Sequence, residues 1–208
     1  PSNVGKREQR HLVFSKACLR HGLPLLYVNQ IGGHDQVIYD GASFAVNALG
    51  AVVFEAKRFT DDVTTLTFDP RSRAFGGADG QDLPPVPLAG LPTLEFYRQQ
   101  IVLGLRDYAR RCGFTKAVVG SSGGIDSALT LVLAAEALGP DNVVGITMPS
   151  IFSSEGSVSD SVRLCHNLGV ALVEHPIRSV VAAFEDAFAT AFGEPLRGLP
   201  LENLQARV

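Results

Sequence analysis

Residues 120–127 read Gly-Ser-Ser-Gly-Gly-Ile-Asp-Ser, so glycines, hydroxyls and one carboxylate are gathered in one short segment. Residues 116–119 before it predict a buried strand, and apolar residues at three- and four-residue spacing over 128–138 predict a helix after it. A loop that leads from a strand end into a helix directs unpaired backbone N–H groups and the positive end of the helix dipole at one place. The segment therefore predicts a phosphate-binding loop.

Two common phosphate loops are excluded by spacing. The three glycines do not fit G-x-G-x-x-G, and no Gly-Lys-Ser/Thr follows them as a Walker loop requires. Glycines let phosphate oxygens approach the backbone, while the hydroxyls of Ser122 and Ser127 add hydrogen-bond donors. A bare carboxylate would repel phosphates, so we interpret Asp126 as a Mg²⁺ ligand. The alternative is a Gly/Ser turn in which the aspartate caps the helix.

The composition bounds the class of protein. The chain has 208 residues, of which 46% are hydrophobic and 19% charged, and its net charge is −3. These values favour a heavily buried globular protein, and no apolar run approaches the roughly 18 residues of a membrane-spanning helix. A slightly acidic chain without a Lys/Arg cluster argues against nucleic acid as a partner.

Three widely spaced cysteines, Cys18, Cys112 and Cys165, each fall in a predicted helix. An odd, scattered set predicts reduced core thiols in a cytoplasmic protein. Because the sequence has no Cys/His cluster, no metal site is expected at these cysteines. The chain lacks an initiator Met and a signal peptide, and we expect it to be an internal piece of a longer protein.

The first part of the chain predicts a helix and antiparallel strands. Residues 6–21 form the helix, with apolar residues Leu12, Val13, Ala17 and Leu19, and Gly22 closes it. The expected strands cover residues 25–28, 37–39, 43–46 and 51–56, followed by extended chain to residue 68. Tyr39 and Asp40 either line a pocket or belong to an Asp-Gly turn.

The second part has a different period. Residues 69–92 contain five prolines and four glycines and predict a stiff interdomain linker without sustained periodicity. A helix is then expected from residue 93, with one face marked by Leu94, Tyr97, Ile101, Leu105 and Tyr108. Beyond it, strands at 116–119, 143–148 and 171–174 alternate with helices at 128–138, 155–168 and 179–192. This alternation predicts a parallel sheet that binds ligands at the carboxyl ends of its strands.

The Ser-Gly-Gly-Ile-Asp-Ser segment, residues 122–127, resembles the pyrophosphate loop of the ATP pyrophosphatases, which transfer AMP to a carboxylate or carbonyl. Residues 148–161, MPSIFSSEGSVSDS, are similar to the M-P-S-x-Y-S-S-x-G-S segment of NAD⁺ synthetases. Residues 201–208 and the helix at 94–114 resemble that family as well. Residues 4–10 and 27–44 resemble the carboxyl-terminal part of the nitrilase-like glutamine amidase fused to the synthetase in its glutamine-dependent form.

This resemblance implies an α/β fold class in two parts. Residues 1–68 would be the end of a nitrilase-like α-β-β-α sandwich, residues 69–92 the linker, and residues 93–208 the start of a doubly wound parallel-sheet synthetase domain. The family's pattern has Tyr where Phe152 stands, commonly an aliphatic residue where Ser121 stands, and frequently Gln where His34 stands.

The resemblance also implies site residues. The expected ATP-binding residues are Gly120, Ser121, Ser122, Gly123, Gly124, Ile125, Asp126 and Ser127, with Asp126 also the metal ligand. Lys6 corresponds to a basic residue that faces glutamine, although a charged first-turn residue is an equal interpretation. The family's amidase uses a Glu, a Lys and a nucleophilic Cys upstream of the matched segment, so no catalytic residue is expected here, and Cys18 is expected to be a buried thiol. Ser153, Ser154 and Ser157 either contact nucleotide or cap the next helix.

The implied function is ATP- and Mg²⁺-dependent amidation of deamido-NAD⁺ to NAD⁺ with ammonia derived from glutamine, by a cytoplasmic homo-oligomer. AMP and pyrophosphate would be released, and this chain by itself is expected to be inactive. Two alternatives stay open. One is another amidotransferase of the same superfamily, similar to GMP synthetase, and the other is a non-catalytic nucleotide-binding piece.

Overall fold

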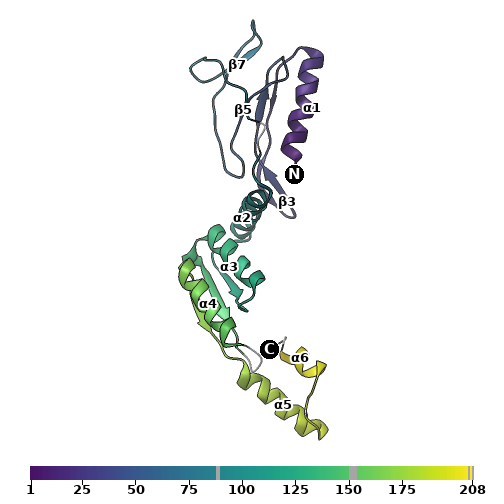
Figure 1. Cartoon of the computed structure of the whole chain (residues 1–208), viewed down its shortest axis with the longest axis vertical. Coiled ribbons are helices and arrows are strands. Elements are labelled where there is room, and N and C mark those ends of the chain that lie inside the picture. Colours follow the sequence, from purple (N-terminus) through teal and green to yellow (C-terminus); the bar gives the residue numbers. More distant parts are fainter. Residues whose placement is uncertain (88–89, 150–153, 206, 208) are drawn as a thin grey trace. The chain divides into compact units, whose positions relative to one another are not determined.

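The computed structural model describes the chain except residues 88–89, 150–153, 206 and 208 (Figure 1). The chain divides into two compact units, Pro1–Gly113 and Phe114–Val208. The first unit is built from antiparallel strands and two helices, and the second alternates parallel strands with helices. The α/β class and the parallel sheet predicted from the sequence are therefore confirmed.

A helix packed on an antiparallel sheet forms the core of the first unit. Helix α1 (Lys6–His21) covers the sheet β1-β4-β5, made of β1 (Leu25–Tyr27), β4 (Phe44–Val46) and β5 (Val52–Glu55). The buried cluster between them consists of Cys18, Phe44, Val46 and Val52, with Phe14, Leu25, Tyr27 and Val86 packed against it. The predicted helix and these three strands are confirmed, although each strand is shorter than expected.

Strands β2 (Ile31–His34) and β3 (Val37–Asp40) form a hairpin, and helix α2 (Thr93–Cys112) of the same unit packs against it. The sequence did not predict β2, because its two central glycines weaken the strand pattern. Those glycines allow close packing: a Cβ on Gly33 would stand 3.2 Å from the Cα of Gly104 in α2. The backbone N–H of Gly33 also donates to Asp107 Oδ2 at 2.7 Å.

The buried face of α1 is polar over the first two turns of the helix and apolar further along, at Phe14 and Cys18. Arg7, Arg10 and His11 are buried, whereas the apolar side chains of Leu12 and Leu19 are 55% and 61% exposed. An apolar helix face is ordinarily the buried one. The first two turns depart from this pattern because Arg7 pairs with Glu55 and Arg10 with Asp40 inside the unit.

Helix α2 also buries a different face from the one that the sequence predicted. The stripe that includes Leu94, Tyr97, Ile101 and Tyr108 is exposed, and the buried residues are Phe96, Val102, Leu103, Asp107 and Ala109. Phe96 and Leu103 pack with Phe59, next to Ile31 and Ile38 of the hairpin. The helix was predicted correctly, but the apolar side chains on both of its sides made the contacting side ambiguous.

Residues 69–92 are more structured than their composition suggested. Strands β6 (Thr67–Asp69) and β7 (Ala74–Gly76) form a hairpin at the start of the segment. Further along, the N–H of Val86 donates to the carbonyl of Val52 at 2.8 Å, and the Val86 side chain joins the core. The prediction of an irregular segment is thus wrong at its beginning, and its role as an interdomain linker stays a prediction.

The second unit contains a three-stranded parallel sheet of order β10-β9-β8. Its strands are β8 (Ala117–Gly120), β9 (Val143–Thr147) and β10 (Ala171–Glu174), and a 3-10 turn, η1 (Pro140–Asn142), precedes β9. Helices α3 (Ile125–Leu138) and α4 (Glu155–Leu168) pack on the sheet and against each other. Helices α5 (Arg178–Phe192) and α6 (Leu199–Gln205) follow (Figure 1).

The cysteines only partly follow the sequence prediction. Cys18 and Cys165 are buried, and burial raises the pKa of both thiols. Cys112 lies exposed in the last turn of α2, so the expectation of a core thiol is wrong there. Cys18 packs among Phe44, Val46 and Val52, which agrees with its predicted role as a buried thiol.

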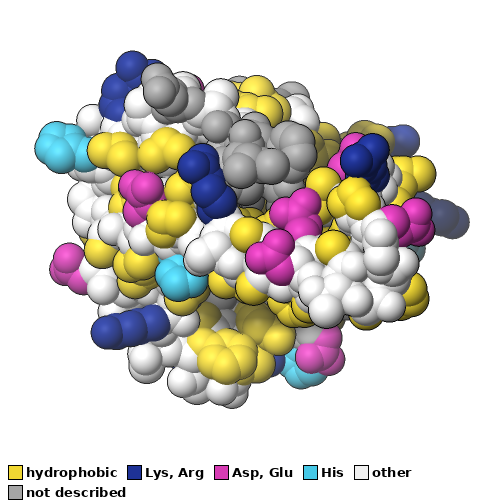
Figure 2. Space-filling view, turned by 90° about the horizontal axis from the view of Figure 1, so that it is seen from below, with side chains coloured by type: hydrophobic (Ala, Val, Ile, Leu, Met, Phe, Trp, Pro, Cys, Tyr) yellow, Lys and Arg dark blue, Asp and Glu magenta, His cyan; other side chains and the backbone are white. Residues whose placement is uncertain are grey.

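The surface mixes side chains of all kinds. On the face drawn in Figure 2, Lys and Arg side chains lie singly among acidic and hydrophobic ones. Phe184 and Phe192 of α5 are exposed, as is Leu199 of α6. Within the described part of the chain, no helix combines the length and the apolar character needed to cross a membrane.

Candidate nucleotide site

The glycine loop, residues 120–127, lies where the sequence placed it, between β8 and α3 at the carboxyl edge of the parallel sheet. The N–H of Ser121 donates to the carbonyl of Ile146 at 2.7 Å, which extends the β8–β9 pairing one residue beyond the strand. Helix α3 begins at Ile125, three residues earlier than predicted. The turn between strand and helix is therefore only four residues long.

Hydroxyl groups hold this short turn in shape. The Oγ atoms of Ser122 and Ser127 lie 3.1 Å apart, and the N–H of Ser122 donates to Ser127 Oγ at 3.2 Å. Ser127 Oγ in turn donates to the carbonyl of Gly124 at 3.0 Å. The two hydroxyls that the sequence assigned to phosphate binding are thus brought together by the fold.

The start of α3 presents backbone donors at the same place. Gly124 is the N-cap residue, and no side chain supplies a cap hydrogen bond. The first intrahelical hydrogen bond runs from Ala128 N to Gly124 O at 3.1 Å, so the N–H groups of residues 125–127 precede it. Such first-turn N–H groups, with the helix dipole behind them, favour an anion.

Asp126 is exposed in the first turn of α3, as is Ile125. Since Gly124 occupies the N-cap, the alternative in which the aspartate caps the helix is wrong. Within the described residues, no group of three or more His, Cys, Asp or Glu side chains could hold a metal ion by itself. One carboxylate nevertheless fits Mg²⁺, because this ion is commonly held by one or two carboxylates together with substrate phosphates.

A cavity of about 290 Å³ opens beside the loop at the strand ends. It is lined by Gly120, Ser121, Ser122, Thr147, Met148, Ser157 and Val158. Thr147 is the last residue of β9 and is buried. Thr147 was not predicted as a site residue, although its position at a parallel strand's carboxyl end was a usable signal.

Helix α4 brings a second segment to the loop. Ser154 is the N-cap of α4, and its Oγ accepts from the N–H of Ser157 at 3.1 Å, so the capping interpretation is confirmed for Ser154. Ser157 also lines the cavity beside the loop. Phe152 and Ser153 lie outside the described residues.

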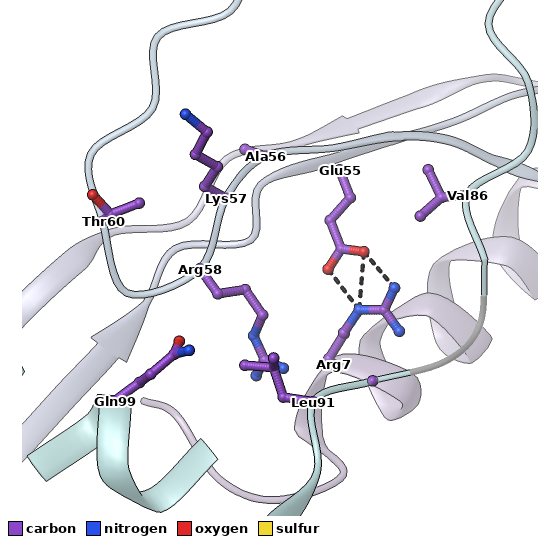
Figure 3. Close-up of a pocket in the computed structure, with 10 residues that line it drawn as sticks. Arg7, Glu55, Ala56, Lys57, Arg58, Thr60, Val86, Leu91 and Gln99 are labelled. Atoms are coloured by element: carbon purple, nitrogen blue, oxygen red, sulfur yellow. Dashed lines mark hydrogen bonds and ion pairs between the residues drawn. The ribbon is translucent and has the colours of Figure 1, made fainter. Parts of the chain in front are cut away.

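The first unit contains a separate cavity of about 520 Å³ (Figure 3). Its lining includes Arg7, whose Nε donates to Glu55 Oε1 at 2.6 Å, and this hydrogen bond raises the pKa of the Arg7 guanidinium. Arg7 Nη2 also donates to the carbonyl of Pro87 at 3.1 Å. The ion pair occupies polar groups that a ligand would need, so the geometry does not assign this cavity a ligand.

Lys6 and Asp40 have different surroundings. Lys6 is exposed, its Nζ lies 3.5 Å from Gln9 Oε1, and it is not among the residues that line the cavity of the first unit. Asp40 is fully buried and accepts from Arg10 Nη1 at 3.2 Å and Arg58 Nη2 at 2.8 Å. Asp40 is thus engaged within the fold as the last residue of β3, and Gly41, with a φ of 67°, forms a β-bridge with Arg58.

Comparisons with known proteins agree with the geometry of the second unit. The model of the family described as NAD synthase matches residues 97–208. A glutamine-dependent NAD⁺ synthetase of Synechocystis sp. is 42% identical over 208 residues, and one of Acinetobacter baylyi is 35% identical over 207. Each match covers all of this chain but only 36% and 37% of the relative, so the chain spans little more than a third of their length.

A solved structure is similar over the whole chain. The glutamine-dependent NAD⁺ synthetase of Acinetobacter baumannii, in complex with adenosine diphosphate, has a TM-score of 0.87 and 35% sequence identity. The similarity covers 100% of this chain and 38% of that one.

Proposed function

The chain belongs to the NAD synthase family, and from this premise we propose that it is the nucleotide-binding part of an enzyme that amidates deamido-NAD⁺ to NAD⁺. The observation that carries the proposal is the glycine loop. Ser122 and Ser127 join their hydroxyls beside the uncapped start of α3, at the carboxyl edge of a parallel sheet. This arrangement suits the phosphates of ATP better than a neutral ligand.

The proposed chemistry begins with activation of a carboxylate. A carboxylate oxygen of the nicotinate group attacks the α-phosphorus of ATP, and pyrophosphate leaves. The N–H groups of residues 125–127 at the start of α3 and the hydroxyls of Ser122 and Ser127 would stabilise the charge that grows on pyrophosphate. Asp126 would hold Mg²⁺, which offsets negative charge on the phosphates when it is bound. Ammonia then displaces AMP and forms the amide.

We assign the remaining residues of the loop to the same ATP site, including Gly120, Ser121 and Ile125. The structure turns the Ser121 side chain into the protein, where it is 4% exposed, so its contribution to ATP binding would be indirect. The match to the NAD synthase model argues against the alternative similar to GMP synthetase.

We further propose that residues 1–68 belong to a nitrilase-like glutamine amidase, residues 69–92 to a linker and residues 93–208 to the synthetase domain. The layer of α1 on an antiparallel sheet supports the first assignment, as do relatives named glutamine-dependent. Lys6 would face the glutamine substrate. The whole enzyme would act in the cytoplasm as a homo-oligomer on small molecules, without nucleic acid or a membrane.

Isotope transfer tests the proposed reaction in the full-length enzyme. Deamido-NAD⁺ that carries ¹⁸O in its nicotinate carboxylate is supplied with ATP, Mg²⁺ and ammonium, and the products are analysed by mass spectrometry. Adenylation predicts that one ¹⁸O atom appears in AMP and none in pyrophosphate. Formation of ADP with ¹⁸O in inorganic phosphate would contradict the proposal, since it requires attack on the γ-phosphorus.

A further inference from the structure

Ser121 is held in place from two directions. Its backbone N–H donates to Ile146 O in β9, and its side chain donates from Oγ to Ser161 Oγ at 2.8 Å. Ser161 lies in α4, forty residues further along the chain. Ser121, the first residue of the turn between β8 and α3, is therefore bonded to both the sheet and the neighbouring helix.

The hydrogen bond between the two serines belongs to a short directional chain. Ser161 Oγ accepts from Ser121 and donates to the carbonyl of Ser157 at 2.9 Å, one turn earlier in α4. Ser161 is 1% exposed, so water cannot readily replace either partner. Consecutive hydrogen bonds of this kind strengthen one another in a buried environment.

The same turn of α4 also contacts the loop through its backbone. Gly123 has a φ of 78°, and a Cβ built on it would stand 2.5 Å from Ser157 Cα. The loop thus lies against Ser157 at one point and is hydrogen-bonded to Ser161 at another. Two contacts one helical turn apart determine both the distance and the direction of the loop relative to α4.

We propose that Ser161 is a positioning residue for ATP, which sets the glycine loop in its binding geometry through Ser121. The inference rests on the proposed function and deepens it. A loop that is already ordered loses less conformational freedom when a ligand binds, so its affinity is higher. Without the Ser161 hydroxyl, the buried hydroxyl of Ser121 has lost its acceptor. This unsatisfied donor favours loop conformations in which the Ser121 hydroxyl is bonded to water instead.

Ser161→Ala in the full-length enzyme tests this role through steady-state kinetics with ammonium as nitrogen donor. We expect the KM for ATP to rise about fivefold, the effect of losing one hydrogen bond. The kcat at saturating ATP should stay within about twofold, because the hydroxyl does not touch reacting atoms. The KM for ammonium should not change.

A matched control is available on the same helix. Ser159 is exposed, and its Oγ donates to Gly156 O within α4 at 2.9 Å. Ser159→Ala therefore removes a hydroxyl with a comparable local hydrogen bond, and its KM for ATP should equal that of the unaltered enzyme.

A second variant tests the positioning role independently of Ser161→Ala. Ser121→Ala removes the same hydrogen bond from the other side, while Ser161 keeps its bond to Ser157, so this variant should raise the KM for ATP even if Ser161→Ala fails to fold. Once both are made, the double variant should be no worse than Ser161→Ala alone, because the two residues act through one interaction.

The results separate the inference from the proposed function. Calorimetry that detects no ATP binding by the unaltered enzyme would overturn both. If the unaltered enzyme binds ATP, and both single variants melt at lower temperature but retain its KM for ATP, the serines only stabilise the fold and the positioning role is wrong.

Discussion

Gly123 lies directly against the backbone of Ser157, so that a Cβ added to the glycine would stand 2.5 Å from both the Cα and the carbonyl oxygen of Ser157. Real Cβ atoms do not approach backbone so closely, and the φ of 78° adds a second obstacle to any side chain. The glycine loop and the first turn of α4 are consequently in direct backbone contact.

Replacing Gly123 by alanine should affect both binding and stability. The added methyl group must push the loop or α4 aside, so we expect at least a tenfold loss of ATP affinity and a lower melting temperature. Calorimetry and thermal unfolding of the full-length enzyme measure the two effects. Gly193→Ala is the control, because Gly193 has a similar φ of 76° but nothing lies within 4 Å of the place that an added methyl group would take. Equal effects of both substitutions would show that backbone strain alone matters.

The ion pair between Arg7 and Glu55 should be important for the stability of the first unit. Both side chains are almost fully buried, so Arg7→Met leaves a buried carboxylate without its main partner. Removal of one member of such a pair costs about 3–5 kcal/mol. Urea unfolding followed by fluorescence or circular dichroism measures this cost. The double variant Arg7→Met/Glu55→Leu should recover part of it, and a double variant less stable than Arg7→Met would contradict this explanation.

A half-exposed pair provides the comparison for Arg7. Arg98 and Glu95 lie one turn apart in α2, and the hydrogen bond from Arg98 lowers the pKa of Glu95 to about 2. Water and salt screen this pair, so Arg98→Met should leave the urea midpoint nearly unchanged. The contrast with Arg7→Met tests whether burial, rather than charge pairing itself, gives the larger effect.

His11 should make the first unit less stable in mild acid. Burial lowers its pKa in the folded state, and nearby Arg7 and Arg58 act in the same direction against Glu55 and Glu8. As the pH falls through about 6.5, the unfolded chain takes up the proton before the folded one, so stability decreases. His11→Gln should reduce this decrease between about pH 7.5 and pH 5.5, the range that brackets the ordinary histidine pKa. Exposed His166→Gln is the control, and equal pH slopes for His11→Gln and the parent would refute the prediction.

Residues 69–92 should influence the coupling of glutamine hydrolysis to NAD⁺ synthesis only where they are not packed on the core of the first unit. Val86 is fixed by Val52, but Pro84 and Pro85 precede that contact, and replacement by Gly-Gly frees their backbone. In the proposed enzyme, glutamine hydrolysis and ammonium-driven synthesis should each keep their rates, while more glutamine is consumed per NAD⁺ formed. Simultaneous assay of glutamate and NAD⁺ measures the ratio. An unchanged ratio would mean that packed residues such as Val86, and not the two prolines, determine how the two activities are coupled.

The sequence predicted the local geometry of the loop better than the orientation of the helices. Strand, turn and helix around residues 120–127 follow from local patterns, because strands and helices alternate there. The predicted burial of the strand is wrong, since Val118 of β8 is 70% exposed. The buried side of α1 could not be predicted, because it depends on the distant carboxylates of Asp40 and Glu55. Strand β2 was missed for a similar reason, since Gly33 is explained only by its contact with α2.

The candidate site was also only partly visible in the sequence. The hydroxyls of Ser122 and Ser127 and the carboxylate of Asp126 could be proposed from residue type and spacing. The inward direction of Ser121 could not, because its partner Ser161 is forty residues away and looks like an ordinary helix serine in sequence. Contacts between elements therefore determine which loop residues face a ligand.

The most direct measurement is ammonium-driven NAD⁺ synthesis by the full-length Asp126→Asn enzyme, with glutamine hydrolysis assayed in parallel. An amide keeps the shape of the side chain but removes the anionic oxygen that Mg²⁺ prefers, so we predict that synthesis falls at least about 100-fold while glutamine hydrolysis remains measurable. Asp141→Asn, at an exposed aspartate of the same unit, should change neither activity. Synthesis at the parent rate by Asp126→Asn would contradict the assignment of this loop to ATP and its metal ion.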